Sequence, residues 1–505
     1  MNKTITRDSQ IVIVGAGVFG LSNALHLAQN GYKNITVFDR LDFTNNHYTF
    51  LEGADTASAD LNKIFRARYE NEKHYQDLAF EAFEIWQKWD REIELLPEHE
   101  AKKYTGLKLL DLCGMLTMDD ILSKGSKESR ENFEKEGFAP LVYDINNPKD
   151  VKRANVAGFG NKVKYGQDMK KKIPQIEGVL DTTSGMLYAS RACQYAKYLC
   201  EQLGVRFVLG GDKGSFQDYI YKDQEQKQVG GIITKDGRRY LADLVVVNCG
   251  PWSTSIVPEL DGINEATGGN IFIFKVPEHR KDLRVKYSAK NFPLIGWKTG
   301  HAREKEHMGG MMMFPMAEPE GYMKIIVRQT KYTNPIKTKD GKIISIPKTS
   351  NSSPPHNYLT KSIVSQAKEW LELFFPDLVE AGIHLESKAL WYTDTINNDY
   401  IYDFVPGKEG LFVACGGSGH AFKMLPVLGQ FLVDKIEGRE NLYTQIFKWR
   451  YPKDFDKDVN GLKEKLDSKR RYDLQELSGP EDLKFQKKSF SSEIGLSNLQ
   501  ITSKL

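Results

Sequence analysis

The first forty residues combine short apolar runs with a glycine-rich turn. Residues 11–14 are four consecutive β-forming residues, and they lead into Gly-Ala-Gly-Val-Phe-Gly at 15–20. The pattern predicts a helix over 21–30, and a second apolar run at 35–38 predicts a strand that stops at Asp39. A strand, a G-x-G-x-x-G turn, a helix and an acid after the next strand together predict a dinucleotide-binding βαβ unit.

Each glycine of this turn has its own expected role. Gly15 permits the tight turn, Gly17 lets the backbone approach a pyrophosphate, and Gly20 lets helix and strand pack closely. The helix N-terminus offers free N–H groups and a positive dipole end to the phosphates. Asp39 stands where a carboxylate would hold a ribose hydroxyl and reject a 2′-phosphate. The alternative is a glycine-rich turn in some other α/β unit.

Apolar periodicity predicts further elements along the chain. The expected helices are 75–86, 192–203 and 362–374. The expected strands are 204–210, 242–250, 389–393 and 411–415, with a hairpin around Asp236-Gly237 and short strands between 271 and 327. A loop or short turn is expected at 178–185, and a long loop is expected at 334–360 because of its Pro, Ser, Asn and Lys content. The charged stretch 92–177 receives no sharp assignment.

The order of these elements predicts two domains, each assembled from separated pieces of a 505-residue chain. The strand at 242–250 returns the chain to the first domain, and 416–423 forms a second glycine-rich strand-to-helix turn. We therefore expect these two separated segments to surround one extended cofactor. The first domain is predicted at 8–90, 186–260 and 401–450. The substrate-facing domain is predicted at 91–185 and 261–400, and 451–505 is expected to be a charged tail that wraps the protein or is partly disordered.

Composition narrows the class of protein. The formal charge is +3 with Lys and Arg dispersed among Asp and Glu, so there is no nucleic-acid footprint. No apolar run approaches ~18 residues, so no membrane span is expected. Residues 1–10 are polar and lack the apolar core of a signal peptide.

The cysteines and the C-terminus predict the compartment. Five cysteines without a C-x-x-C pair predict reduced intracellular thiols rather than a disulfide framework or a structural zinc site. They are Cys113, Cys193, Cys200, Cys249 and Cys415. Ser503-Lys504-Leu505 is the peroxisomal S-K-L signal, which predicts a peroxisomal import receptor as partner and favours chemistry that releases hydrogen peroxide.

Four motifs together resemble the D-amino-acid-oxidase superfamily. They are G-A-G-V-F-G at 15–20, D-L-N-K-I-x-R at 60–66, C-G-P-W at 249–252 and G-G-S-G-H-A-F-K at 416–423. Within the superfamily they are similar to the branch of sarcosine, pipecolate, saccharopine and fructosyl-amino-acid oxidases, over nearly the whole chain to about residue 440. The resemblance implies an α/β and α+β fold: a discontinuous Rossmann-type FAD-binding domain with an antiparallel-sheet substrate domain.

The resemblance also implies a reaction. A C–N bond of a secondary amino acid is oxidised, a hydride equivalent passes to flavin N5, the imine hydrolyses, and O2 is reduced to H2O2. The protein supplies orientation and electrostatics to the flavin's chemistry. Lys324 falls where the family has its oxygen-activating lysine, since a fixed cation stabilises charge developing on oxygen. Lys423 and Arg66 fall at positions that hold the substrate carboxylate.

Each of these residues also has an ordinary structural interpretation. Lys324 would then be a solvated strand lysine, Lys423 a helix-start lysine facing water, and Arg66 a partner in a helix-face salt bridge. His420 would be a hydrogen-bonded structural histidine.

The residues that the resemblance assigns to FAD are Gly15, Ala16, Gly17, Val18, Phe19, Gly20, Asp39, Arg40, Ser58, Asp60, Lys63, Ile64, Val208, Gly250, Trp252, Ser418, Gly419, His420, Phe422 and Lys423.

One departure from the family pattern concerns flavin attachment. In many relatives a cysteine in a C-W-x-x-D-T or C-M-Y-T context forms a thioether to the flavin. Here the run reads Leu-Trp-Tyr-Thr-Asp-Thr from Leu390, which predicts non-covalent FAD. Cys415, just before the second glycine-rich turn, is the alternative attachment point, or else a small buried strand residue.

The sequence leaves the substrate open. The run F-K-M-L-P-V-L-G from Phe422 is closer to fungal saccharopine or pipecolate oxidases, whereas Glu318-Pro319 ahead of Lys324 keeps fructosyl-amino-acid oxidases open. Sarcosine is a further alternative. Other classes are a flavin dehydrogenase with a non-oxygen acceptor, a protein that holds FAD without turnover, and an NAD-dependent dehydrogenase, which would share the first motif only.

Overall fold

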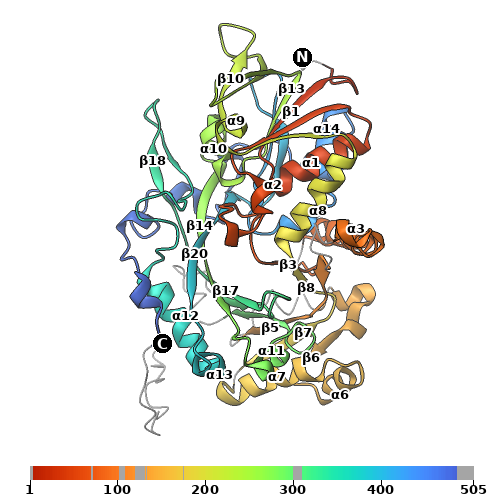
Figure 1. Ribbon diagram of the computed structural model, residues 1–505, viewed down its shortest axis with the longest axis vertical. Coiled ribbons are helices and arrows are strands. Elements are labelled where there is room, and N and C mark those ends of the chain that lie inside the picture. The colour runs from red at the N-terminus through yellow and green to blue at the C-terminus, as the bar shows by residue number, and fades with distance from the viewer. Residues whose placement is uncertain are drawn as a thin grey trace.

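Two large sheets occupy the upper and lower halves of the molecule in Figure 1. The computed structural model describes residues 4–69, 72–101, 108–119, 131, 133–174, 176–298 and 310–485. The upper sheet has six strands, all parallel except one at the edge, and the lower sheet has eight, antiparallel except for one neighbouring pair. The expected mixture of a Rossmann-type sheet and an antiparallel sheet is therefore confirmed.

The upper sheet is assembled from four separated parts of the chain. Its order is β21 (Ile401–Phe404), β22 (Leu411–Cys415), β13 (Leu244–Val247), β1 (Gln10–Val14), β2 (Asn34–Asp39) and β9 (Arg206–Leu209). β1 lies at its centre, where Ile13 is in register with Val37 on one side and Val246 on the other. Its inner strands read as continuous apolar runs because both faces are covered.

Alternate residues of β1 enter two different cores. Ile11 and Ile13 pack with α1 (Val18–Gln29), α8 (Ala189–Gln202) and α14 (Gly429–Ile436). Val12 and Val14 pack toward the small sheet of β10 (Phe216–Tyr221), β11 (Val229–Thr234) and β12 (Arg239–Leu241). This alternation is the side-chain period of a strand with both faces buried.

Two long strands carry the chain between the halves. β14 (Asn264–Lys275) and β20 (Glu386–Thr395) pair along ten residues and extend from the upper half into the lower half in Figure 1. The remaining strands of the lower sheet are, in order from β14, β17 (Tyr322–Tyr332), β16 (Gly310–Met313), β15 (Leu294–Lys298), β5 (Met115–Asp119), β7 (Glu177–Asp181) and β6 (Val142–Asp144). β3 (Lys63–Phe65), β8 (Gly185–Leu187) and β4 (Leu110–Asp111) form a small sheet.

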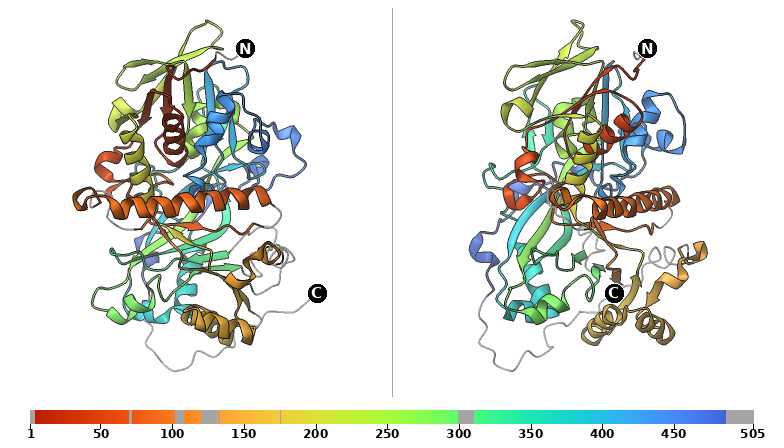
Figure 2. Two further views of the ribbon diagram at one scale, coloured as in Figure 1. Left: turned by 90° about the vertical axis from the view of Figure 1, so that its right-hand side faces the viewer. Right: turned by 45° about the vertical axis from the view of Figure 1, so that its right-hand side comes forward.

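Helices cover the lower sheet and separate the halves. One core contains residues of the sheet and of α6 (Pro148–Val156), α7 (Gly160–Lys172), α11 (Lys281–Lys286), α12 (Lys361–Phe374) and α13 (Pro376–Glu380). α3 (Lys73–Leu95) crosses the middle of the molecule in Figure 2. The shorter elements are α2 (Phe43–Asn46), α4 (Glu98–Ala101), α9 (Gly211–Gly214), α10 (Ser253–Ile256), α15 (Leu442–Ile446), β18 (Pro335–Lys337) and β19 (Ile343–Ser345).

Two expected loops contain strands. The stretch 178–185 carries the end of β7 and the start of β8, so the turn is confined to the residues between Asp181 and Gly185. There the Asp181 carboxylate accepts hydrogen bonds from the Thr183 N–H and the Ser184 hydroxyl. The stretch 334–360 contains the β18–β19 hairpin. The expected turn at 178–185 is present but shorter than predicted, and a hairpin interrupts the expected long loop at 334–360, because strands of three to five residues have too few positions to show a period.

The charged C-terminal stretch wraps the lower half as far as residue 485. The backbone of Arg471 forms an isolated β-bridge with Thr333, just after β17, and Leu477 forms one with Thr360. Tyr472 is fully buried. The Ser503-Lys504-Leu505 signal lies outside the described residues. Each of the two large sheets draws its strands from the segments predicted for one domain, and the boundaries themselves stay a prediction.

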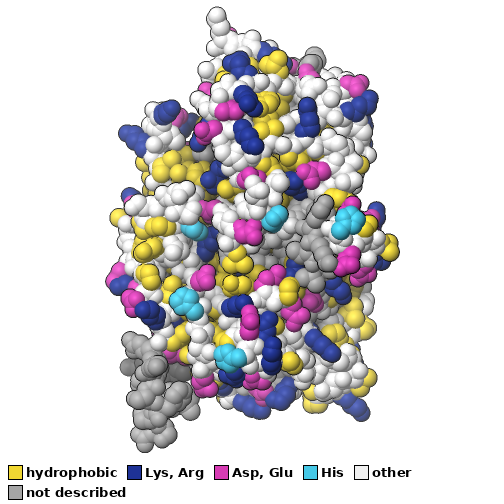
Figure 3. Space-filling view, viewed as in Figure 1, with side chains coloured by type: hydrophobic (Ala, Val, Ile, Leu, Met, Phe, Trp, Pro, Cys, Tyr) yellow, Lys and Arg dark blue, Asp and Glu magenta, His cyan; other side chains and the backbone are white. Residues whose placement is uncertain are grey.

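The surface is of mixed charge. Lys and Arg side chains lie among Asp and Glu over the face shown in Figure 3. Within the described residues no helix is both long and apolar enough to cross a membrane, and no group of three His, Cys, Asp or Glu residues is arranged to hold a metal ion.

We expect the α1–α14 contact to depend on Gly429. A Cβ there would lie 2.1 Å from the Ser22 carbonyl oxygen and 2.8 Å from His26 Cβ. Gly429→Ala should therefore lower the free energy of unfolding by about 1–3 kcal/mol, as overpacking does. Gly479→Ala is the control, because its Cβ would meet nothing within 4 Å. Equal urea midpoints for the two variants would contradict the assignment.

Candidate active site

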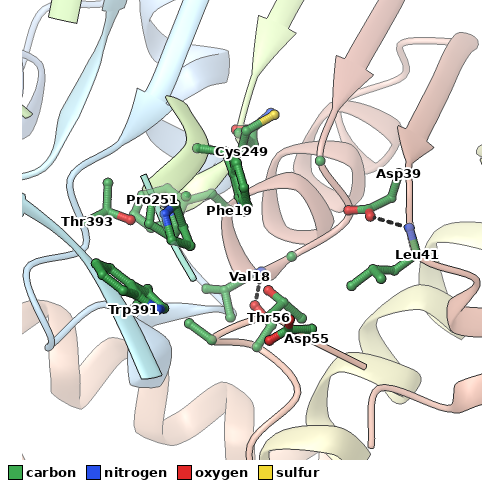
Figure 4. A pocket seen from close by; sticks show the side chains of 18 of the residues that line it. Val18, Phe19, Asp39, Leu41, Asp55, Thr56, Cys249, Pro251, Trp391 and Thr393 are labelled. Carbon is green, nitrogen blue, oxygen red and sulfur yellow. Dashed lines mark hydrogen bonds between the residues drawn. The ribbon is translucent and has the colours of Figure 1, made fainter. Parts of the chain in front are cut away.

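A cavity of about 570 Å³ opens where the upper sheet meets the long strands. Its lining comes from all of residues 38–41, 214–217, 347–349, 388–393 and 417–422 and from parts of 14–19, 55–63 and 248–256. Figure 4 shows Asp39 and Leu41 on one side and Trp391, Thr393 and Pro251 on the other. Both glycine-rich turns thus reach one cavity, as predicted.

The first turn leaves space that a side chain would fill. Gly15 has φ +104°, and a Cβ on it would lie 2.5 Å from the Asn248 carbonyl oxygen. A Cβ on Gly17 would lie 2.9 Å from Ser58 Oγ, which accepts the Val18 N–H at 3.1 Å. A Cβ on Gly20 would come within 1.8 Å of the Gly15 carbonyl oxygen. The turn is therefore a bare cradle at the N-terminus of α1, the geometry that suits a pyrophosphate.

Asp39 ends β2 and braces this turn. Its carboxylate accepts the N–H of Ala16 at 2.8 Å and that of Leu41 at 2.9 Å, the second drawn in Figure 4. Burial raises the pKa of Asp39, although the two N–H groups and Arg40 oppose that effect. The Arg40 guanidinium lies 5.2 Å from the centre of the Trp252 ring, and both residues line the cavity.

The second turn is held by β20 and by a cluster of aromatic residues. Ser418 N–H donates to the Thr393 carbonyl at 2.9 Å, and a Cβ on Gly419 would lie 3.3 Å from the Tyr392 ring. His420 Nε2 lies 2.9 Å from the Asn398 carbonyl oxygen, and its Nδ1 lies 3.3 Å from the hydroxyls of Tyr69 and Tyr400. Burial lowers the pKa of His420 to about 3, so the ring is neutral. His420 is a hydrogen-bonded histidine that also lines the cavity.

Lys423 and Arg66 meet over one tyrosine ring beside this turn. Lys423 Nζ lies 4.9 Å and the Arg66 guanidinium 5.1 Å from the centre of the Tyr69 ring. Lys423 is buried and donates to the His420 carbonyl at 2.9 Å, whereas Arg66 is exposed. Burial and the charge of Arg66 lower the pKa of Lys423 well below its usual value, against the pull of Glu72. Within the described part of the chain, neither cation forms an ion pair with a carboxylate. Because Lys423 is buried, it does not face water.

Lys324 belongs to a second cluster, in which two lysines share one aspartate. It is fully buried, its ammonium donates to Asp60 Oδ2 at 2.7 Å, and Lys63 Nζ lies 2.8 Å from the same oxygen. Burial alone would raise the pKa of Asp60, but the two ammoniums lower it to about 2. Burial lowers the pKa of Lys324 to about 8 against the attraction of Asp60. The cluster carries a net positive charge beside the cavity that Lys63 lines.

Most residues predicted to hold a cofactor line the cavity. Those that do are Gly15, Gly17, Val18, Phe19, Asp39, Arg40, Ser58, Lys63, Gly250, Trp252, Ser418, Gly419, His420 and Phe422. Those that lie outside the lining are Ala16, Gly20, Asp60, Ile64, Val208 and Lys423. Gly20 faces Gly15, and Asp60 is enclosed by Lys63 and Lys324. Val208 packs against the core that contains Val12 and Val14 of β1.

The sequence did not reveal several residues of the site. Asp55 lines the cavity, 3.6 Å from Lys388 Nζ, and its carboxylate accepts the Ser350 N–H at 3.1 Å. Tyr69 and Tyr400 enclose His420. Tyr69 and His420 are 351 positions apart, and Asp55 is also far from Lys388 along the chain, so no sequence signal joins either pair, whereas Tyr400 lies 20 positions before His420. Tyr69 does lie close to a recognised motif, since it follows the 60–66 motif by three residues.

Leu390 lines the cavity, as expected of the residue at the usual cysteine position. Cys415 does not: it is fully buried in the core on the far side of β22, and burial raises the pKa of its thiol to about 12. The cysteine of the lining is Cys249, whose Sγ lies 3.3 Å from the Val14 carbonyl oxygen. The structure thus gives no support to Cys415 as an attachment point.

Residues 10–435 match the family model of FAD dependent oxidoreductases. The chain belongs to this family. The L-saccharopine oxidase of Schizosaccharomyces pombe is 25% identical over 87% of this oxidoreductase and 93% of its own length. The peroxisomal sarcosine oxidase of Homo sapiens is 23% identical over 84% and 90%.

Solved structures share the fold of this oxidoreductase. A fructosyl peptide oxidase from E. terrenum has a TM-score of 0.68 at 23% identity, covering 88% of this chain and 93% of that one. A modified fructosyl peptide oxidase from Aspergillus nidulans has a TM-score of 0.71 at 23% identity, covering 94% and 100%.

The residues present fit FAD. The bare cradle at Gly15 and Gly17 suits the pyrophosphate, and the cavity continues from there to β20 and the second glycine-rich turn.

Because Leu390 has no nucleophile, we expect acid precipitation of the yellow holoprotein to release all flavin absorbance into the supernatant. Flavin retained in the pellet would contradict non-covalent binding. Comparing the Cys249→Ala and Cys415→Ala variants would then identify the cysteine responsible.

Proposed function

We propose that this oxidoreductase is an FAD-dependent oxidase of an N-substituted amino acid such as L-saccharopine or L-pipecolate. The observation that carries the proposal is the pair of cations, Lys423 and Arg66, that share the Tyr69 ring beside the cavity. A buried ammonium without a carboxylate partner is costly unless an anion joins it. A substrate carboxylate supplies that anion. The names of the similar saccharopine and sarcosine oxidases are in keeping with such a substrate.

The chain's own residues then have distinct tasks. Lys423, fixed by the His420 carbonyl, and Arg66 hold the carboxylate and so orient the neighbouring C–N bond. Bound FAD supplies the two-electron chemistry and the reaction with oxygen. Lys324 is held rigidly by Asp60, and its positive charge stabilises negative charge that develops on oxygen.

A fructosyl-amino-acid substrate remains the alternative, because Glu318-Pro319 precedes Lys324. The proposed compartment is the peroxisome, with its import receptor as partner. The support is Ser503-Lys504-Leu505 and the peroxisomal sarcosine oxidases of Homo sapiens and Mus musculus among the similar proteins.

The test is release of peroxide in air by the purified holoenzyme with L-saccharopine, L-pipecolate, sarcosine and fructosyl-valine. We expect peroxide with one of the first two. Lys423→Met should raise KM for that substrate about tenfold to a hundredfold, since it removes a charge-assisted hydrogen bond. Lys162→Met is the matched control, because Lys162 is equally buried but donates to the carbonyls of Cys113 and Ala289. Flavin bleaching under nitrogen without peroxide in air would instead indicate a dehydrogenase.

Lys324 gives a second, pH-dependent prediction. Its pKa of about 8 means that the ammonium becomes neutral as the pH rises through 8, so reoxidation of the reduced enzyme by oxygen should slow over that range. Lys324→Met should lower the reoxidation rate by about 10²–10³-fold, the usual effect of removing one stabilising donor, and abolish this pH dependence. Stopped-flow measurement of both half-reactions checks it. An unchanged reoxidation rate would refute the role of Lys324 in oxygen reduction.

A further inference from the structure

An irregularity in β17 brings two cations to the face of the lower sheet that carries Lys324. Asn270 of β14 pairs with Val327, but the next paired position is Gly268 with Tyr332. Four residues of β17, 328–331, therefore stand opposite the single residue Gly269. Bulges of this kind re-aim side chains and are common next to active sites.

The bulge decides which way Arg328 and Lys331 face. Val327 and Tyr332 both enter the core on the outer face of the sheet, so their neighbours Arg328 and Lys331 both lie on the opposite face. In a regular strand, residues three apart would lie on opposite faces. Lys324 and Ile326 occupy the same face as Arg328, and Ile326 packs with Leu390 of the cavity lining.

The tyrosine of the lining, Tyr392, lies between this bulge and the second glycine-rich turn. A Cβ on Gly269 would lie 2.3 Å from the Tyr392 ring, and one on Gly419 would lie 3.3 Å from it. The ring therefore fills the space that both glycines leave. Lys331 Nζ lies 5.8 Å from the centre of this ring. Burial raises the pKa of Tyr392, and the nearby charge of Arg328 opposes that effect.

The two cations of the bulge are not equivalent. Lys331 is ion-paired with the buried Asp394 at 2.9 Å and also donates to Asn460 Oδ1, so its charge is already compensated. Arg328 is exposed and forms no ion pair with any described residue. A guanidinium at such a position is suited to bidentate binding of a carboxylate.

We infer that Arg328 is a second carboxylate-binding residue of the substrate site, on the other side of Tyr392 from Lys423 and Arg66. The substrate class that fits is an amino acid whose nitrogen substituent itself carries a carboxylate. The inference rests on the proposed function for the first carboxylate. It favours substrates of the saccharopine kind over pipecolate, sarcosine or fructosyl-valine, because only the former has a second carboxylate.

The test measures binding without turnover. The holoenzyme is titrated with α,ω-dicarboxylates from glutarate to pimelate and with monocarboxylates of matched length, followed by the change in flavin absorbance. We expect at least one dicarboxylate to bind about ten times more tightly than its monocarboxylate, the effect of one added charge-assisted contact. Arg328→Ala should remove that preference and leave monocarboxylate binding unchanged, and Arg328→Lys should retain part of it.

Arg238→Ala is the control for net charge, since Arg238 lies on the exposed hairpin beyond β11 and pairs with Asp236. Equal binding of both ligand series by the unmodified holoenzyme, or a preference that survives in Arg328→Ala, would overturn the inference. A preference lost only in Arg328→Ala, in an enzyme that releases no peroxide with any amine of the panel, would uphold the second carboxylate site and refute the proposed oxidase function.

Discussion

The buried cluster of Asp60, Lys324 and Lys63 joins the two halves of the molecule. Asp60 and Lys63 belong to the segment that follows the first glycine-rich turn, whereas Lys324 lies on β17 of the lower sheet. Both ammoniums meet Asp60 Oδ2 and the Leu61 N–H donates to Oδ1, so each oxygen of the buried carboxylate has a partner, whereas a lone buried charge would be strongly destabilising. The position of Lys324 relative to the cavity is therefore set by electrostatics and not by apolar packing alone.

The long pair β14–β20 provides the mechanical frame for this cluster. Along β20, Leu390 and Tyr392 face the cavity, and the carbonyl of Thr393 accepts the Ser418 N–H. One strand of the lower sheet thus holds the second glycine-rich turn of the upper half. The C-terminal wrap adds to the frame, because the Asn460 amide donates to the Thr395 carbonyl and to Asn398 Oδ1, and the Asn398 carbonyl in turn contacts His420.

The sequence predicted the parts of this arrangement that are local. The turn at 15–20 was readable because its strand, glycines, helix and Asp39 follow one another within thirty residues, and α1, α8 and α12 showed a helical period. The proposed oxygen role of Lys324 came mostly from the family resemblance and only partly from the electrostatics of a fixed cation. Nothing local links Asp60 to Lys324, 264 positions away, or Tyr69 to His420, 351 positions away. The bulge at 328–331 is set by register with β14, which periodicity within one strand cannot show.

The cations of the site differ in how their charge is balanced, and that difference gives each its chemical character. Lys324 and Lys63 share one aspartate, and Lys331 has its own. Lys423 has a carbonyl and an aromatic face, which orient an ammonium without neutralising it. A group whose charge is compensated by the protein can act on a transient charge, because it does not need a ligand to be stable. A cation left uncompensated gains most from an anionic ligand, so under the proposed function the substrate carboxylate would offset the cost of burying Lys423.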